Sequence, residues 1–298
     1  MLRQHLLRLL LLCSFAWAAA AFAQPAAPRI VVVADGETAP YQAAVAEISA
    51  LARASGTVVL RPTGQLLSSA LQMGTLSRSD IFVALGARTT AQVQGLGTPV
   101  QAMSCLTIER TGLPGVVLTH SAAARIELLK RIVPKASQIG VLYDPAGSRT
   151  DLAALVSAAT AVQATIVARP VTDAASLAMQ LERLANEVDV LLATYDQRIY
   201  SAKNAAPLIR FSYQHRIPFV GMSDSWARAG ALAGIDWDYK ELAEQCAAKA
   251  VRLAAGERIE AEPKRPTRMP YAINAATARE LGVTLPAAVA QGARQVFE

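Results

Sequence analysis

Histidine and cysteine are scarce in this 298-residue chain, and their positions exclude most catalytic and metal-binding sites. The only histidines are His5, His120 and His215, and no second cysteine or histidine follows any of them at metal-ligand spacing. A lone histidine is more often a hydrogen-bonded structural residue, because a metal site needs several ligands with supporting partners. We therefore expect neither a metal nor a cofactor.

Nucleotide-binding motifs are also missing. No G-x-x-x-x-G-K-[ST] occurs, and Gly95-Leu-Gly97 lacks the third glycine of a dinucleotide-binding turn. The basic residues are scattered apart from Lys264, Arg265 and Arg268, so the chain lacks the basic stripe of a nucleic-acid-binding protein. The sequence thus excludes these nucleotide-dependent enzymes, and we expect no nucleic acid as a partner.

Two cysteines, Cys105 and Cys246, lie outside the N-terminal segment, and the chain has no C-x-x-C. In an oxidising compartment they could form a disulfide. Free cysteine is among the residue types most often buried. The sequence favours buried thiols and leaves the disulfide open.

The N-terminal segment, residues 1–23, has the layout of a secretory signal peptide. Arg3 and Arg8 give a basic start, Leu6 to Ala21 form an apolar run, and Ala21-Phe22-Ala23 is a cleavage site of the A-x-A type. The strongly apolar part is short for a membrane span of about 20 residues. We expect cleavage near Ala23 and a periplasmic mature chain of about 275 residues, with a net charge of about +4.

Short apolar strands alternate with longer helical patterns through the rest of the chain. Strands that are apolar almost throughout, separated by helices of 10 to 15 residues, are typical of parallel sheets covered on both faces. About ten strands are predicted, too many for one open sheet in a chain of this length. We therefore predict an α/β fold with two lobes. The best-marked strands cover residues 29–34, 80–85, 138–143, 165–171 and 188–194.

Two helices have clear end signals. Ser121 can cap a helix that Pro134 stops, and Asp238 with Glu241 forms a capping box for a helix that ends near Gly256. A proline-rich stretch with Pro263, Pro266 and Pro270 follows, and it predicts a segment that crosses between the lobes.

The stretch VGMSDSWARAGALAG, residues 220–234, resembles the nucleophile elbow of a hydrolase. In that fold a histidine follows the serine along the chain, but every histidine of this sequence precedes Ser223. A serine without a positioned base is unreactive at its normal pKa. We therefore expect no catalytic residue and no enzyme.

Polar and aromatic residues recur where predicted strands end. In open parallel sheets ligands bind outside the carboxyl ends of the strands, where helix N-termini also offer N–H groups to an anion. Each residue taken singly could be an ordinary helix cap or turn, but their recurrence at the same strand ends favours a ligand site. The candidates are Asp35, Thr38, Arg88, Thr89, Tyr143, Asp144, Tyr195, Asp196, Ser223, Asp224, Ser225, Trp226 and Asp236.

Four segments of the second half carry a family resemblance. They are LLKRIVPKASQIGVLYDP (128–145), HRIPFVGMSDSWARAGALAG (215–234), DYKELAEQCAAKAVRLAAGE (238–257) and PTRMPYAINAATARELGVTLP (266–286). The last three stand in family order and at family spacing. These segments resemble the ABC transporter substrate-binding proteins of the tryptophan/tyrosine-binding type, over roughly residues 115–286.

The resemblance implies the periplasmic binding protein type I fold, with two Rossmann-like lobes whose parallel sheets are joined by crossing hinge segments. One lobe would comprise residues 24–118 plus about 238–256, and the other residues 119–237 plus about 267–274. A C-terminal tail would cover residues 275–298.

The implied function is capture of a small amino-acid-like or aromatic solute by hinge closure, in a monomer that serves an ABC permease or another membrane partner. The alternative is a regulatory or sensory periplasmic protein that signals to a membrane partner without transport. In our hypothesis Thr89 and residues 223–225 bind a carboxylate, and Asp236 or Asp196 binds an ammonium group. Tyr143, Tyr195 or Trp226 would stack on an apolar part of the solute.

Overall fold

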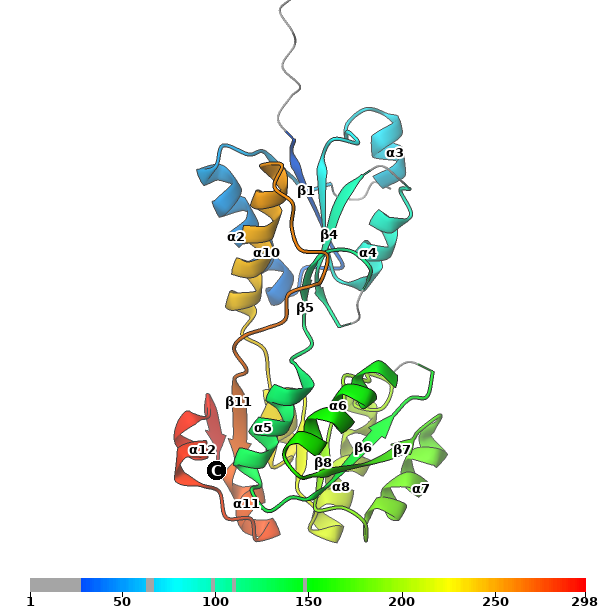
Figure 1. Cartoon of the computed structure of the whole chain (residues 1–298), viewed down its shortest axis with the longest axis vertical. Helices are drawn as coiled ribbons and strands as arrows, with labels where there is room; N and C mark the ends of the chain where they lie inside the picture. The colour runs from blue at the N-terminus through cyan, green and yellow to red at the C-terminus, as the bar shows by residue number, and fades with distance from the viewer. Residues whose placement is uncertain (1–27, 63–66, 98–99, 109–110, 147–148) are drawn as a thin grey trace, which may run out of the picture.

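A computed structural model describes residues 28–62, 67–97, 100–108, 111–146 and 149–298. The chain forms two α/β lobes, placed end to end and joined at a narrow waist (Figure 1). The expected signal peptide, residues 1–23, and its cleavage site near Ala23 lie outside the described residues. Within the described ranges, no helix is long and apolar enough to span a bilayer.

The N-terminal lobe contains a five-stranded parallel sheet with the order β2-β1-β3-β4-β5. Its central strand β3 is buried along its whole length, as expected for apolar strands that carry helices on both faces. The strands are β1 (Ile30–Ala34), β2 (Val59–Leu60), β3 (Ile81–Leu85), β4 (Gln101–Thr107) and β5 (Gly115–Val117). The helices are α2 (Ala39–Ala54), α3 (Leu67–Gln72), α4 (Ala87–Gln94) and the late helix α10 (Tyr239–Ala254).

Helix α10 returns from the second lobe and packs beside α2 against one face of this sheet (Figure 1). Small residues of the two helices, among them Ala44, Ala52 and Ala247, are buried in the core of this lobe. Cys246 of α10 is bonded to Cys105 of β4, and both are fully buried. The preference for free thiols was therefore wrong, because α10 brings the two cysteines to a Cα–Cα distance of 6.2 Å.

The C-terminal lobe contains a seven-stranded sheet with the order β12-β11-β10-β9-β8-β6-β7. All its pairs are parallel except β10 with β11. The strands are β6 (Gln138–Tyr143), β7 (Thr165–Pro170), β8 (Val190–Leu192), β9 (Phe219–Gly221), β10 (Ala233–Ile235), β11 (Tyr271–Asn274) and β12 (Gln295–Phe297). The helices are α5 (Ala122–Ile132), α6 (Arg149–Ala161), α7 (Ala174–Leu184), η1 (Ala202–Asn204), α8 (Ala205–His215), α9 (Asp224–Ala229), α11 (Ala275–Leu281) and α12 (Ala287–Gly292).

The predicted α/β architecture with two mostly parallel sheets is confirmed. The cap at Ser121 also holds, since its hydroxyl accepts a hydrogen bond from the Ala124 N–H at 3.1 Å. Residues 275–298, expected as a C-terminal tail, form α11, α12 and a final strand that adds to the sheet beside β11. That strand has three residues and pairs with a segment more than 20 residues away, so no local periodicity predicts it.

Three segments cross the waist, and hydrogen bonds join them. The first runs from β5 to α5, the second from β10 to α10, and the third enters β11 from residue 264 onward. The Trp237 indole donates to the Leu118 carbonyl at 2.6 Å, which joins the second crossing to the first. The buried Glu241 carboxylate accepts the N–H groups of Thr267 and Arg268, both at 2.9 Å, and ties the third crossing to α10.

Candidate functional site

The crossings place the carboxyl ends of both parallel sheets at the waist. Strand β5 leads into the first crossing at its carboxyl end, and β10 leads into the second at its carboxyl end. Because neighbouring parallel strands end at the same edge of a sheet, the loops after β1, β3, β6, β8 and β9 lie at the two edges that adjoin the waist. Most residues predicted for a ligand site belong to these loops.

In the N-terminal lobe, Asp35 lies against the first turn of α4. Its carboxylate accepts the N–H groups of Arg88 at 2.9 Å and Thr89 at 2.6 Å. Gly86 is required here, since it has a φ of 103° and a Cβ would collide with the Asp35 carboxylate. The Arg88 side chain is 70% exposed, and Thr38 is exposed at the start of α2.

The prediction for the Thr89 hydroxyl has to be corrected. Thr89 is buried, and its hydroxyl donates to the Leu85 carbonyl at 3.1 Å within α4 and the preceding turn. Its N–H is taken by Asp35. Neither group remains for a solute carboxylate, so Thr89 shapes the loop rather than the contact surface.

In the C-terminal lobe, Asp144 and Asp196 organise the loops after β6 and β8. The Asp196 carboxylate accepts the Asp144 N–H at 2.8 Å, and the Asp144 carboxylate pairs with Arg198. Asp144 is buried, Tyr143 is half-buried beside it, and the Arg198 side chain is 69% exposed. The sequence identified both carboxylates but not the arginine that lies on them.

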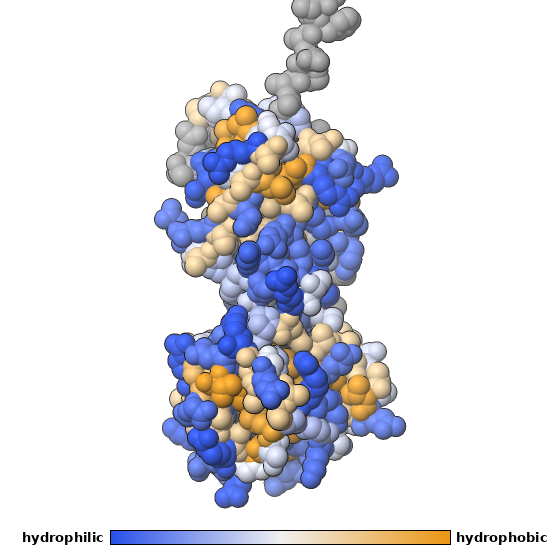
Figure 2. All heavy atoms as spheres, turned by 90° about the vertical axis from the view of Figure 1, so that its left-hand side faces the viewer, coloured by the Kyte–Doolittle hydropathy of each residue, from blue (hydrophilic) through white to orange (hydrophobic). Residues whose placement is uncertain are grey.

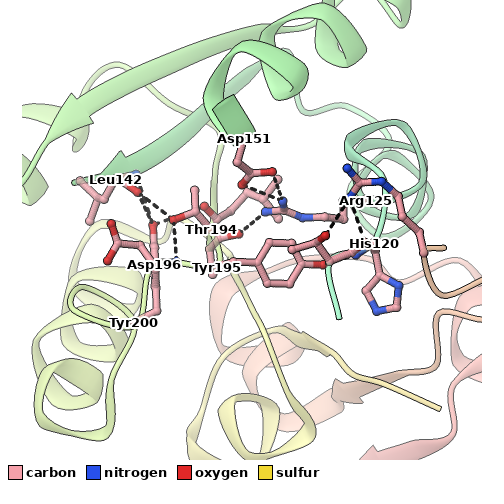
Figure 3. Close-up of polar contacts among 12 residues, drawn as sticks. His120, Arg125, Leu142, Asp151, Thr194, Tyr195, Asp196 and Tyr200 are labelled. Atoms are coloured by element: carbon pink, nitrogen blue, oxygen red, sulfur yellow. Dashed lines mark hydrogen bonds and ion pairs between the residues drawn. The ribbon is translucent and has the colours of Figure 1, made fainter. Parts of the chain in front are cut away.

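Tyr195 connects this edge to the first crossing (Figure 3). Its hydroxyl accepts the His120 N–H at 2.7 Å, and the guanidinium of Arg125 lies 4.7 Å from its ring centroid. Arg125 is fully buried. Its guanidinium donates to both carboxylate oxygens of Asp151, at 3.0 and 3.1 Å, and to the Ala193 carbonyl at 2.6 Å. Burial raises the pKa of Tyr195 to about 12, so this hydroxyl stays protonated.

A second polar group lies at the ends of β9 and β10. Asp224 and Asp236 face each other across Arg294, whose Nη2 contacts one oxygen of each carboxylate. Burial raises the pKa of Asp224, the negative charge of Asp236 adds to the effect, and Arg294 opposes it. Arg294 comes from the segment just before β12, which the sequence did not connect with the site.

In the turn at residues 223–225, the two serine hydroxyls contact each other. The Ser223 hydroxyl lies 2.5 Å from the Ser225 hydroxyl, whereas His120 Nε2 contacts the Asp236 carbonyl at 3.0 Å. Gly234 of β10 lies directly beneath this turn, and a Cβ there would collide with the Ser223 carbonyl. In the described ranges, no group of three or more His, Cys, Asp or Glu side chains could hold a metal ion.

Trp226 must be removed from the predicted stacking residues. It is only 8% exposed and packs edge-on against Phe219 at 5.3 Å between ring centroids, because α9 turns it onto Gly221 and into the core. The tryptophan at the waist is Trp237, whose ring lies 6.4 Å from those of His120 and Tyr195 and 6.0 Å from that of Tyr239. Its place directly after Asp236 at a strand end was the available sequence signal.

His120 makes the stability of the waist sensitive to acid. It is 2% exposed, and burial lowers its pKa to about 4, with Arg125 acting in the same direction and Asp236 and Glu241 opposing. Between pH 6.5 and 4 the unfolded chain binds this proton and the folded chain does not, so stability falls as the pH falls. We expect a loss of up to about 1.4 kcal/mol per pH unit from this group. Urea unfolding from pH 7 to 4.5 should show a flatter profile for His120→Gln; equal slopes would contradict the assignment.

Two lobes whose strand-end loops border a narrow waist have the periplasmic binding protein type I fold. Residues 103–297 match the family described as ABC transporter substrate binding protein. The chain belongs to this family, which is one of substrate-binding proteins and not of enzymes, and the resemblance noted in the sequence is confirmed.

The chain is also similar to individual known proteins. The "Tyrosine-binding protein" of Clostridioides difficile (strain R20291) is 24% identical over 166 residues, which are 54% of this chain and 47% of that protein. The match therefore spans about half the length of the curated relative. An ABC domain from Streptococcus pneumonia in complex with L-Trp has a TM-score of 0.63 at 18% identity, covering 91% of this chain and 99% of that one. The ligand-free, open structure of a substrate binding protein with adhesive properties from Clostridium difficile has a TM-score of 0.72 at 18% identity, with the same coverage.

Proposed function

We propose that this protein captures a small amino-acid-like or aromatic solute between its lobes by hinge closure and delivers it to an ABC permease. One observation carries the proposal. In both lobes, the sheet edge at which the parallel strands have their carboxyl ends adjoins the waist, beside the aromatic side chains of Tyr195 and Trp237. Support also comes from the family and from relatives named for tyrosine or solved with L-Trp. The protein would act as a periplasmic monomer after removal of its signal peptide, without catalysing a reaction.

Binding is expected to raise the stability of the protein in a thermal-shift screen of the 20 amino acids and the purines. At a ligand concentration of 100 times the dissociation constant, the gain should be about 2.7 kcal/mol. L-Trp and L-Tyr are the first compounds to test, and ribose serves as a solute without an ammonium, carboxylate or aromatic group.

Hinge closure gives an independent measurement. A compound that raises the melting temperature should also reduce the radius of gyration in X-ray scattering, because the lobes approach each other around the solute. If no small solute changes either quantity, the transport proposal is wrong.

A further inference from the structure

Arg294 occupies the position at which the sequence suggested an ammonium site. Its backbone N–H donates to the Tyr271 carbonyl at 2.8 Å, which fixes it at the edge of the sheet where β9 and β10 end. Its Nη2 contacts Asp224 and Asp236, and Nη1 lies 3.4 Å from the Trp237 carbonyl. The chain therefore supplies its own cation to this pair of carboxylates.

The remaining oxygens of the pair are poorly placed for a solute cation. Asp236 Oδ1 accepts the Trp237 N–H at 2.9 Å, and Asp224 Oδ1 is buried with no hydrogen-bond partner among the residues that the structure describes. A solute ammonium at the two Oδ2 atoms would have to compete with the guanidinium that already contacts both of them.

The other strand-end carboxylates are similarly engaged. Asp35 accepts two N–H groups at the start of α4, and Asp144 accepts the Ala146 N–H at 2.9 Å and also pairs with Arg198. The acidic residues of these loops therefore position the chain and its arginines.

The guanidinium of Arg294 still presents donors to solvent. The side chain is 41% exposed. Guanidinium groups bind carboxylates through strong charge-assisted hydrogen bonds. Two aspartates hold the group in place, so little conformational entropy is lost when an anion binds. On the face of the molecule drawn in Figure 2, hydrophilic residues gather at the waist.

We propose that Arg294 binds the carboxylate of the solute and that the binding site requires this carboxylate but not an amino group. The inference rests on the proposed function, and it narrows the ligand class to organic carboxylates with an apolar or aromatic body. Asp224 and Asp236 then act as positioning residues for Arg294, in place of the ammonium-binding role suggested for Asp236.

Two series of compounds test this with the full mature protein by calorimetric titration. One series is L-tryptophan, indole-3-propionate and tryptamine; the other is L-tyrosine, 3-(4-hydroxyphenyl)propionate and tyramine. In at least one series the wild-type protein should bind the two compounds that carry a carboxylate, the amino acid and the propionate, with affinities within about tenfold of each other. The amine should bind about 10- to 100-fold more weakly, the range expected for losing a hydrogen-bonded charge contact.

Variants of Arg294 separate recognition from a structural role. Arg294→Gln should weaken binding of the acids about 10- to 100-fold without weakening the amine, and Arg294→Lys should keep part of the preference. Arg279→Gln is the matched control, because it removes another exposed arginine that contacts the C-terminal segment, at Glu298. A structural role alone would lower the melting temperature and weaken all compounds equally.

Three results would overturn the proposal in distinguishable ways. Binding of the amines as tightly as the acids by the wild-type protein would refute it while leaving solute capture intact. An unchanged preference for acids in Arg294→Gln would do the same. If the wild-type protein bound none of the six compounds and the wider screen found no solute, the proposed function itself would fail, and this inference with it.

Discussion

Replacing Asp151 with alanine is expected to lower the free energy of unfolding by about 3 to 5 kcal/mol. The reason is the partner that remains: the guanidinium of Arg125 is fully buried, and Asp151 is the carboxylate paired with it. Without Asp151, the charge keeps the Ala193 carbonyl and the face of the Tyr195 ring but loses its counter-ion. Urea unfolding monitored by circular dichroism, analysed with a common slope, measures this loss.

A double variant distinguishes the uncompensated charge from simple loss of packing. In Arg125→Met/Asp151→Ala the buried charge disappears, and an apolar side chain fills most of its volume. We expect the double variant to be more stable than Asp151→Ala alone, because replacing both members of a buried pair with apolar groups is often neutral. If it were less stable, the charge would not be the cause.

An exposed ion pair gives the matched control. Lys240 and Glu244 lie one helical turn apart in α10, 3.9 Å from each other and exposed to solvent. Glu244→Ala should change the stability by less than about 0.5 kcal/mol, as is usual for pairs of this kind. A loss for Asp151→Ala as small as this would contradict the importance of burial.

The sequence predicted those parts of the fold that local patterns specify. The bounds of β6 were predicted correctly, and α5 begins at its predicted cap, since an apolar run and a capping serine act within a few residues. The capping box at Asp238 is only half formed. Asp238 accepts the Glu241 N–H, but the Glu241 carboxylate turns to the third crossing, which local sequence cannot reveal.

The residues of the candidate site also divide into those that local sequence patterns predict and those that depend on tertiary contacts. The carboxylates at strand ends were found because a strand end is a local feature, whereas Arg294 reaches Asp224 only through the addition of β12 to the sheet. Trp226 and Trp237 both follow strands closely, and the sequence chose the one that is buried in the core. Which ring enters the core depends on the turn of α9 against Gly221, a tertiary contact.

Removing the disulfide between Cys105 and Cys246 is expected to lower the free energy of unfolding by about 4 kcal/mol, the upper end of the usual range. The cysteines are 141 residues apart, so the bond closes a loop that contains the whole seven-stranded sheet apart from β11 and β12. In the chain-entropy account, such a long loop restricts the unfolded chain strongly. Unfolding of Cys105→Ala/Cys246→Ala in urea measures the effect.

The state of the cysteines can be established before any variant is made. Alkylation of the denatured, unreduced mature protein should modify neither cysteine, and alkylation after reduction should modify both. Labelling of both cysteines without reductant would contradict the bond, and the buried free thiols favoured by the sequence would then be correct.

The region of the protein that loses protection gives a sharper test than the size of the stability loss. Cys246 attaches α10 to β4, and α10 also holds the third crossing through Glu241. Hydrogen exchange in the double alanine variant should therefore increase in α10, β4 and the crossing near residue 267, while β6 and β8 of the other lobe keep their protection. Equal increases in both lobes would mean that the bond acts only on the unfolded chain. An increase confined to α10, β4 and the crossing would show that the disulfide also stabilises the folded N-terminal lobe where this crossing leaves it.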